Sequence, residues 1–250
     1  MENTSNTPVQ LLKRLDCNAS SSRDLNDFIF RIIQPCESDV ALDIGCGSGK
    51  QLREIAKKVK SVTGLDISSE LIDTIRTSLP EQNNVQLLVG SMDDLADINL
   101  KLEFTLVYSA YSLYYSKDIT KLVTCIRSLL IKMGSRCFVI APDVGNNAEW
   151  FDDLQTIFEL PEDILASPRI SRDKILPSLL NSFPEVHCYH FENEVEFKTI
   201  DELMKYYDGC GSYCRHDKRE EAKKYFRERI QKEGKYTMRK IALGMLGIIR

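Results

Sequence analysis

The sequence has no hydrophobic run long enough to cross a membrane as a helix, which takes roughly 18 residues. Its first residues, MENTSNTPVQ, also lack the charged and then apolar pattern of a secretory signal. Hydrophobic residues still make up 43% of the 250 positions, which is enough for a sizeable core. We therefore expect a cytoplasmic protein with no membrane partner, whose eight cysteines are thiols.

The chain also lacks an excess of positive charge, since 33 Lys and Arg stand against 37 Asp and Glu, for a net charge of −4 at pH 7. Residues 215–240 are an exception, with eleven basic and five acidic side chains. The acids are interleaved with the bases there, which is typical of a solvated helix face. An acidic chain without an aromatic and basic stacking platform argues against nucleic acid as a partner.

Histidine is scarce, with three residues, and no complete metal-binding pattern is present. The nearest approach is Cys210-x-x-x-Cys214-x-His216, for which Cys188 and His190 are the only nearby complement. Structural zinc sites take two matched pairs of ligands at regular spacing. We therefore expect no metal and interpret these residues as small side chains of a loop.

Residues 40–66 have the pattern of a nucleotide-binding unit. VALDIGCGSGK is an apolar run followed by glycines at 45, 47 and 49, and the next residues place apolar side chains at the spacing of an amphipathic helix. A second apolar run then ends at Asp66. Strand, glycine loop, helix, strand and acid form a βαβ unit, in which the acid can accept two hydrogen bonds from a ribose diol. The glycines permit a sharp turn and close approach of a ligand.

The glycine spacing narrows the choice of nucleotide. A dinucleotide fingerprint reads G-x-G-x-x-G, and here the last interval is one residue short, which disfavours a nicotinamide dehydrogenase. A phosphate-binding P-loop would continue with Lys and then Ser or Thr, but Lys50 is followed by Gln51. Two structural readings remain open: the glycines could form only a tight turn, and Asp66 could be only a neighbour of the helix caps Ser68 and Ser69.

Asp43-x-Gly45-x-Gly47-x-Gly49 resembles the first motif of the class I S-adenosylmethionine-dependent methyltransferases, of the type that acts on small molecules. Asp66 matches the acid after the second strand, residues 90–93 (GSMD) match the third motif, and residues 103–115 (EFTLVYSAYSLYY) look like strand four with its loop. The resemblance covers roughly residues 25–145, and the C-terminal hundred more loosely. It implies S-adenosylmethionine as cofactor and S-adenosylhomocysteine as product.

The resemblance also implies a role for each matched residue. The glycine loop would hold the methionine part of the cofactor, Asp66 the ribose, and Met92 and Asp93 the adenine. The cofactor-binding residues expected on this basis are Asp43, Gly45, Cys46, Gly47, Gly49, Asp66, Ile67, Ser91, Met92, Asp93 and Ser109. For two of them a plainer reading stays open, because Asp93 could simply cap the next turn and Cys46 could be a small loop residue.

Methyl transfer from S-adenosylmethionine needs an acceptor aligned behind the activated methyl group, and a general base is optional. The strand-four loop lacks the D/N-PP-Y pattern of nucleic-acid base methylating enzymes and has no histidine. It offers Tyr111 and Tyr114, which we expect to position the substrate. We predict in-line transfer to an oxygen or nitrogen of a small molecule. The alternatives are a protein or RNA acceptor, which residues 215–240 would favour, and an inactive cofactor-binding module.

Alternating periodicities predict an α/β fold with a mostly parallel sheet covered on both faces. Strands are expected at 39–44, 61–66, 85–89, 103–109, 136–141, 186–197 and 236–249, the last with a bend or bulge at Gly244 or Gly247. Helices are expected at 22–33, 49–59, 69–79, 118–132, 147–160, 171–182, 200–208 and 215–233.

The resemblance implies a seven-stranded, doubly wound, Rossmann-like sheet whose antiparallel last strand inserts between strands five and six. It further implies a single methyltransferase domain over residues 1–250, as a monomer or homodimer. Within it we expect a loosely ordered N-terminus at 1–20 and a cofactor-binding core at 21–145. Helical insertions at 146–184 and 198–234 would act as lids on the substrate side.

Overall fold

A computed structural model describes residues 9–10, 13–14, 23–79, 83–98, 100, 103–130 and 132–250 of the chain. By its internal contacts the chain divides into two compact units. The main unit comprises Leu25–Pro142, Arg169–His190 and Leu243–Arg250, and the smaller unit comprises Met1–Asp24, Asp143–Pro168 and Phe191–Ala242. The expected loose N-terminus falls almost wholly outside the described residues. A single methyltransferase domain with lid segments stays a prediction.

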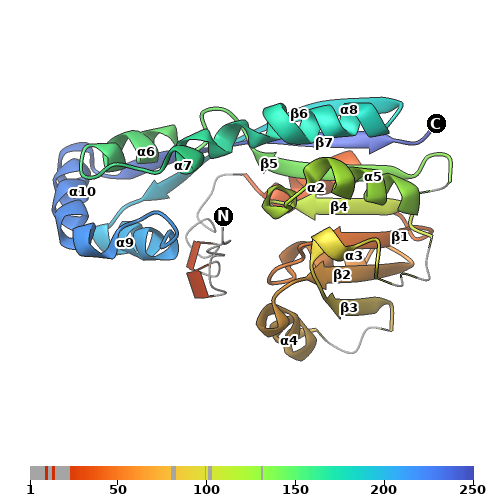
Figure 1. Cartoon of the computed structure of the whole chain (residues 1–250). Coiled ribbons are helices and arrows are strands. Elements are labelled where there is room, and N and C mark those ends of the chain that lie inside the picture. The colour runs from red at the N-terminus through yellow and green to blue at the C-terminus, as the bar shows by residue number, and fades with distance from the viewer. Residues whose placement is uncertain are drawn as a thin grey trace. The chain divides into compact units, whose positions relative to one another are not determined.

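The strands form one seven-stranded sheet in the order β3-β2-β1-β4-β5-β7-β6 (Figure 1). They span β1 Val40–Ile44, β2 Ser61–Asp66, β3 Val85–Val89, β4 Leu106–Ala110, β5 Arg136–Pro142, β6 Glu185–Phe197 and β7 Tyr236–Ile248. The pairs among β1 to β5 are parallel, and β7 is antiparallel between β5 and β6. The predicted fold class and strand order are therefore confirmed.

The helices of the main unit are α2 Leu25–Ile33, α3 Lys50–Ala56, α4 Ser69–Ser78, α5 Ile119–Leu129 and α8 Leu176–Ser182. Those of the smaller unit are α6 Ala148–Gln155, α7 Glu162–Ala166, α9 Ile200–Gly209 and α10 Arg219–Glu233. The sequence prediction missed α7, and the helix expected at 171–182 begins as a π-helical turn, Ser171–Ile175. In that turn the Leu176 N–H reaches back to the Ser171 carbonyl, next to Pro177, which has no N–H to donate.

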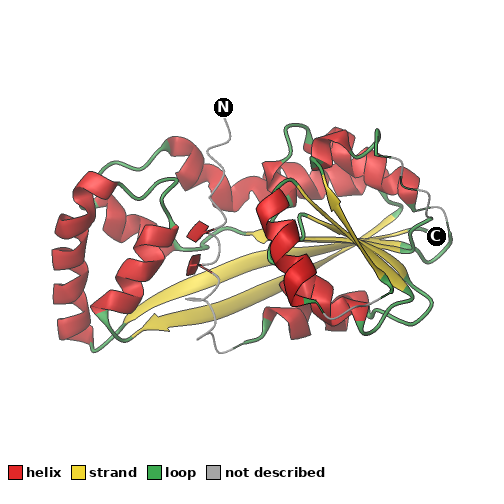
Figure 2. Cartoon of the chain, turned by 90° about the horizontal axis from the view of Figure 1, so that it is seen from below, coloured by secondary structure: helices red, strands yellow, loops and turns green. Residues whose placement is uncertain are grey.

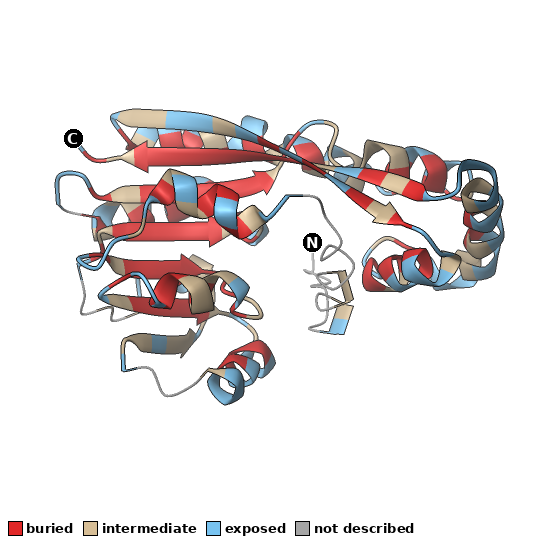
Figure 3. Ribbon diagram, turned by 180° about the vertical axis from the view of Figure 1, so that it is seen from behind, coloured by how far each residue is buried: buried red, intermediate tan, exposed pale blue. Residues whose placement is uncertain are grey.

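The sheet of the main unit is covered on both faces, as the helices on either side of the fanned strands show (Figure 2). Alternate strand residues point to opposite faces. On one face Leu42 and Ile44 join a cluster with apolar residues of α5 and α8. On the other face Leu52 of α3 lies against Gly64 of β2. This double coverage leaves β1 and β4 almost wholly buried, in contrast to the edge strand β3 (Figure 3).

The glycines of the last strand serve close packing. β7 runs uninterrupted through Gly244 and Gly247, where the sequence suggested a bend or bulge. A Cβ atom at Gly247 would approach the Phe183 ring to 2.6 Å, and one at Gly244 would lie 3.0 Å from Phe138. Real Cβ atoms do not come closer than about 3.0 Å to another heavy atom. Neighbouring rings therefore occupy the space that a side chain would need.

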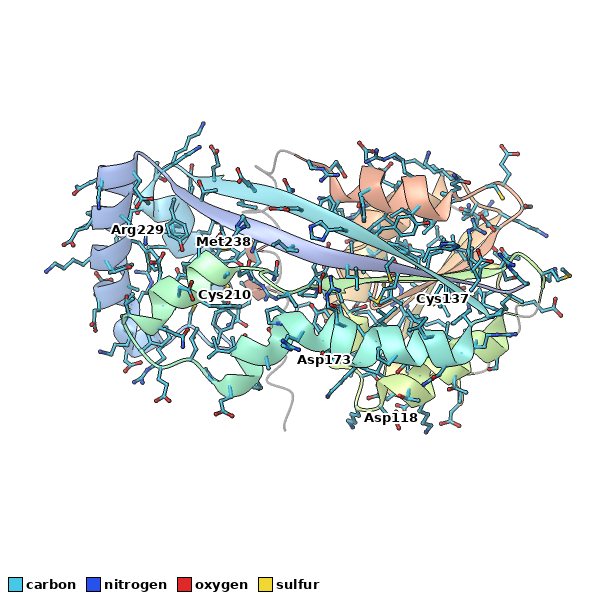
Figure 4. All side chains as sticks on the ribbon, turned by 90° about the horizontal axis from the view of Figure 1, so that it is seen from above. Asp118, Cys137, Asp173, Cys210, Arg229 and Met238 are labelled. Atoms are coloured by element: carbon cyan, nitrogen blue, oxygen red, sulfur yellow. The ribbon has the colours of Figure 1, made fainter. Side chains whose placement is uncertain are left out.

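The smaller unit has an aromatic core of its own. Trp150 of α6 is fully buried and stacks on Phe226 of α10, with ring centroids 5.0 Å apart, and its edge meets Tyr206 of α9 at 5.4 Å. Met238 of β7 belongs to the same cluster (Figure 4). The aromatic residues of this unit thus serve packing.

Among the described residues, no helix is long and apolar enough to span a membrane.

Candidate active site

The glycine loop follows β1 at the edge of the sheet where β1, β2 and β4 all end, because these strands are parallel. Gly45, Gly47 and Gly49 have φ angles of 73°, 53° and 75°. All three lie in the left-handed region that side chains with a Cβ atom rarely adopt. The alternation of glycines in the sequence thus has a direct backbone cause. Gly45 and Gly47 of the resulting loop are partly exposed at the carboxyl ends of the strands.

Asp66 at the end of β2 holds this loop in shape. Its carboxylate accepts a hydrogen bond from the Gly47 N–H at 2.8 Å and one from the Ser68 N–H at 2.9 Å, each on a different oxygen. Each carboxylate oxygen can accept a further bond, so both stay able to receive a ribose hydroxyl. The helix cap of α4 is Ser68, whose hydroxyl accepts from the Leu71 N–H at 3.3 Å.

Asp43 lies inside the sheet directly below the loop. It is 2% exposed and accepts a hydrogen bond from the Tyr108 hydroxyl at 2.8 Å, across neighbouring strands. Burial, and secondarily the charge of Asp66, raise the pKa of Asp43 to about 7, although the Tyr108 hydrogen bond opposes the rise. A positive group brought close would favour the ionised form of this carboxyl.

Cys46, the next residue of the loop after Gly45, is a buried packing residue. Its Sγ lies 3.1 Å from the position of a Cβ atom at Gly64. Burial, with Asp43 and Asp66 nearby, raises the pKa of the Cys46 thiol far above its usual range. A thiol so far from ionisation is a poor nucleophile. The geometry supports the plainer reading of this cysteine as a small loop residue.

Ile67 follows Asp66 and is 72% exposed, an unusual state for a large aliphatic side chain beside a polar loop. Met92 also reaches this region, because its Cε lies 3.7 Å from the Cβ position of Gly45. An apolar contact surface next to a ribose-binding acid suits a flat base. The adenine contact expected for Met92 and the cofactor contact expected for Ile67 stay predictions.

Asp93 is engaged by the strand-four turn. Its carboxylate accepts hydrogen bonds from the Ser116 hydroxyl at 2.6 Å and from the Lys117 N–H at 3.1 Å. The Ser91 hydroxyl accepts in turn from the Asp93 N–H at 3.2 Å and caps the 3₁₀ helix Met92–Asp94. Asp93 therefore ties the turn after β3 to the turn after β4, and its contact with adenine stays a prediction.

Ser112 is a residue that the sequence analysis did not assign. Its hydroxyl donates to the Ile44 carbonyl at 2.6 Å and contacts the Ser109 hydroxyl, also at 2.6 Å. A Cβ atom at Gly45 would overlap both Cβ and Oγ of Ser112. Nothing in the sequence points to this contact, because Gly45 and Ser112 lie far apart along the chain. The predicted cofactor residue Ser109 is buried within this hydroxyl pair.

Tyr111 has a φ angle of 57°, a left-handed conformation that costs energy for a residue with a side chain. Its N–H still donates to the Ile140 carbonyl of β5 at 2.9 Å, and the left-handed φ ends the strand at this residue. Burial raises the pKa of Tyr111 well above its usual range, which rules it out as a general base near neutral pH. A positioning role stays a prediction.

Tyr114 lies in the 3₁₀ helix Leu113–Tyr115 and packs against the core cluster of the main unit. Its ring centroid is 4.6 Å from that of Tyr115, which is 43% exposed. Tyr114 is therefore partly a packing residue, and only part of its surface is open to a ligand. Its predicted role in substrate positioning is not tested by these contacts.

No group of three or more His, Cys, Asp or Glu side chains capable of holding a metal ion occurs in the described part of the chain. Cys210 and Cys214 of the smaller unit are both buried thiols.

The sequence matches a family model described as a methyltransferase domain over residues 41–134, which includes the glycine loop, Asp66 and the strand-four turn. A protein of Methanococcus vannielii named probable cobalt-precorrin-6B C(15)-methyltransferase (decarboxylating) is 33% identical over 84 residues, 33% of this chain and 47% of that protein. Nodulation protein S of Sinorhizobium fredii is 24% identical over 117 residues, 47% of this chain and 53% of that protein. The chain thus matches about half the length of these relatives.

Solved structures share the fold at low sequence identity. The YcgJ protein of Bacillus subtilis superposes with a TM-score of 0.59 at 13% identity, covering 90% of this chain and 97% of its own. The N-methyltransferase NodS of Bradyrhizobium japonicum gives a TM-score of 0.52 at 11% identity, covering 98% and 99%. The chain contains a class I methyltransferase domain, a family whose cofactor is S-adenosylmethionine.

Proposed function

We propose that this chain is an enzyme that transfers a methyl group from S-adenosylmethionine to an oxygen or nitrogen atom of a small-molecule acceptor. The observation that carries the proposal is the pairing of Asp66 with the glycine loop, in which the acid at the end of β2 accepts from Gly47 at 2.8 Å. That arrangement places a partly exposed glycine loop beside a carboxylate that can receive a diol.

The residues present fit the chemical groups of this cofactor. The half-buried carboxylate of Asp66 suits the sulfonium and ammonium groups of the methionine part, and these positive groups would favour the ionised form of the buried Asp43. Remaining lone pairs on Asp66 suit the ribose, and the exposed Ile67 suits the face of the adenine. The bound cofactor would supply a methyl group already activated on a sulfonium.

The remaining task of the protein is to hold the acceptor in line with the methyl group and to exclude water. Tyr111 and Tyr114 are our candidates for this positioning. Because burial raises the pKa of Tyr111 far above its usual range, this tyrosine does not take the acceptor's proton. A neutral amine, which attacks without strong base assistance, is an acceptor that fits such a site.

The names of related proteins support a small acceptor. One relative is named for methylation of cobalt-precorrin-6B, and a protein of the same fold is named an N-methyltransferase. A protein or RNA acceptor is the alternative. The cytoplasmic location and the monomer or homodimer expected from the sequence remain part of this proposal.

The test is calorimetric titration with S-adenosylmethionine and S-adenosylhomocysteine, with NAD as the comparison ligand. We expect micromolar binding of both adenosyl compounds and a loss of at least about tenfold in Asp66→Ala, because a charge-assisted hydrogen bond to a ligand contributes roughly 1.5–3 kcal/mol. Asp73→Ala is the matched control, since Asp73 is an exposed acid of α4 paired with Arg76. Failure of wild-type protein to bind either adenosyl compound would refute the proposal.

A second step tests transfer itself. Protein that binds the cofactor is incubated with a labelled methyl donor and panels of amines, phenols and carboxylic acids, and in parallel with peptides and RNA. Label in a small molecule supports the proposal. Label only in peptide or RNA would replace the acceptor class, and binding without any transfer would favour an inactive cofactor-binding module.

A further inference from the structure

The glycine loop and the strand-four turn meet at one side chain, Ser112. Its hydroxyl has a single proton, and that proton is donated to the Ile44 carbonyl at 2.6 Å. The 2.6 Å contact with Ser109 must then be a bond from the Ser109 hydroxyl to Ser112. A chain of two hydrogen bonds therefore runs from the interior of β4 to the last residue of β1, immediately before Gly45.

The same side chain makes a steric contact with the loop. A Cβ atom at Gly45 would overlap Cβ and Oγ of Ser112, so the glycine backbone rests directly on the serine. Ser112 is buried, and Gly45 has a φ angle of 73°. A closely packed contact of this kind cannot yield without displacing one of its two partners.

Ser112 also belongs to the turn 111–115, which contains Tyr111 and Tyr114. It follows Tyr111, whose φ of 57° folds the chain back toward β1. Its carbonyl accepts from the Tyr115 N–H at 3.0 Å, which closes the 3₁₀ helix Leu113–Tyr115. Ser112 thus takes part both in the end of β1 and in the turn with the candidate substrate-positioning residues.

We propose that Ser112 is a positioning residue that couples the state of the glycine loop to the conformation of the turn 111–115. Binding of the methionine part of the cofactor at the loop would order this turn before an acceptor arrives. The inference rests on the proposed function, because it needs a cofactor at the loop. Its content is a coupling between the cofactor side and the acceptor side through one hydroxyl, and such a coupling acts equally in both directions.

The test is hydrogen exchange of peptides covering 45–49 and 111–115, with and without S-adenosylhomocysteine, in wild type and Ser112→Ala. In wild type we expect the ligand to slow exchange in both peptides by about fivefold or more, the lower end of usual coupling between sites. In Ser112→Ala the ligand should still slow exchange at 45–49, while its effect at 111–115 should fall below about twofold. A role in stability alone would raise exchange equally with and without ligand.

Two further variants separate the outcomes. Ser128→Ala removes a hydroxyl that bonds only within α5, to the Cys125 carbonyl at 2.7 Å, and should behave as wild type. Ser112→Cys keeps a γ atom and a weak donor, should recover part of the coupling, and serves if Ser112→Ala does not fold. Once an acceptor is known, Ser112→Ala should lower kcat more than it raises the KM for the cofactor.

The possible failures differ from one another. Ligand-induced slowing at 111–115 that persists in Ser112→Ala, with normal binding, would overturn the coupling and leave the proposed function intact. Slowing that is confined to 45–49 in wild type would overturn it as well. Absence of any binding by wild type would overturn the proposed function and this inference together.

Discussion

The fold alters the ionisation of Asp43, directly below the glycine loop, and the effect of this carboxyl on stability has a definite sign. Its pKa is 3.8 in a model peptide and about 7 in the folded chain, chiefly through burial. The folded state therefore prefers the protonated form. The resulting stabilisation is complete below pH 4 and is lost as the pH rises through 7.

We predict that Asp43→Asn makes the ligand-free protein more stable than wild type at pH 8 but not at pH 4. Asparagine keeps an acceptor for the Tyr108 hydroxyl and cannot ionise, so the difference at pH 8 could reach about 4 kcal/mol at 1.4 kcal/mol per pKa unit. Thermal unfolding of both proteins at pH 4, 6 and 8 measures it. A stability difference between the two proteins that does not change from pH 4 to pH 8 would contradict the raised pKa of Asp43.

The same substitution should weaken cofactor binding, because it removes the carboxylate that we propose to lie near the positive methionine part. The expected pattern is opposite in sign for the two assays: greater stability without ligand and poorer affinity for S-adenosylmethionine at pH 8. Sites that bind charged ligands often hold such a compromise between stability and function.

At the scale of elements, Arg136 joins three segments at the amino end of the sheet. Its guanidinium forms a two-pronged pair with Asp39, with distances of 2.7 Å and 3.1 Å, and Nε donates to the Ile33 carbonyl at the end of α2 at 2.6 Å. Burial would raise the pKa of Asp39, but hydrogen bonds from Arg136, the Cys36 N–H and Thr105 outweigh it and lower this pKa to about 2.

We predict that Arg136→Ala destabilises the main unit by about 3–5 kcal/mol, since it leaves the buried Asp39 carboxylate without its charged partner. Urea unfolding at pH 7 measures the change. Arg76→Ala is the control, because the exposed pair of Arg76 with Asp73 should contribute less than about 1 kcal/mol. Similar losses in the two variants would show that Arg136 acts only as a surface charge.

The bounds of helices and strands were predicted best where one hydrophobic periodicity covers the whole element. β2 and β3 were placed to the residue, whereas β4 begins at Leu106 and not at 103. Phe104 forms only an isolated bridge with Leu130, so the apolar pattern starts before the regular ladder does. The short helix α7 was missed because five residues carry too little periodicity to detect.

In the candidate site, too, some residues were predictable from the sequence and others were not. The glycines and Asp66 were predictable because each has its own local signature, a left-handed turn or an acid at a strand end. Ser112 was not, since its role depends on Gly45, from which it is separated by the three strands β2, β3 and β4. A local sequence pattern predicts residues whose role depends on their own backbone conformation. Contacts between loops depend on the order of the strands in the sheet, which the local pattern does not contain.

For the whole molecule, the division into two compact units was not foreseen, because β6 and β7 are each continuous strands with residues in both units. The smaller unit has its own buried polar centre. Asp153 of α6 accepts from the Tyr225 hydroxyl at 2.7 Å, from Arg229 at 2.6 Å and from the Tyr236 hydroxyl at 2.9 Å. These partners lie on α10 and β7, so one carboxylate joins three elements.

We predict that Asp153→Ala destabilises the smaller unit by about 3 kcal/mol, because the partly buried Arg229 and two hydroxyls lose their common buried acceptor. The neighbouring Asp152→Ala is the matched control, since Asp152 is exposed. Hydrogen exchange should accelerate in peptides of α6, α10 and the first half of β7 only in the Asp153 variant.

All the predicted cofactor residues belong to the main unit. The affinity for S-adenosylhomocysteine should therefore stay within about twofold of wild type, as for independent sites. A tenfold loss of affinity would mean instead that the smaller unit completes the cofactor site.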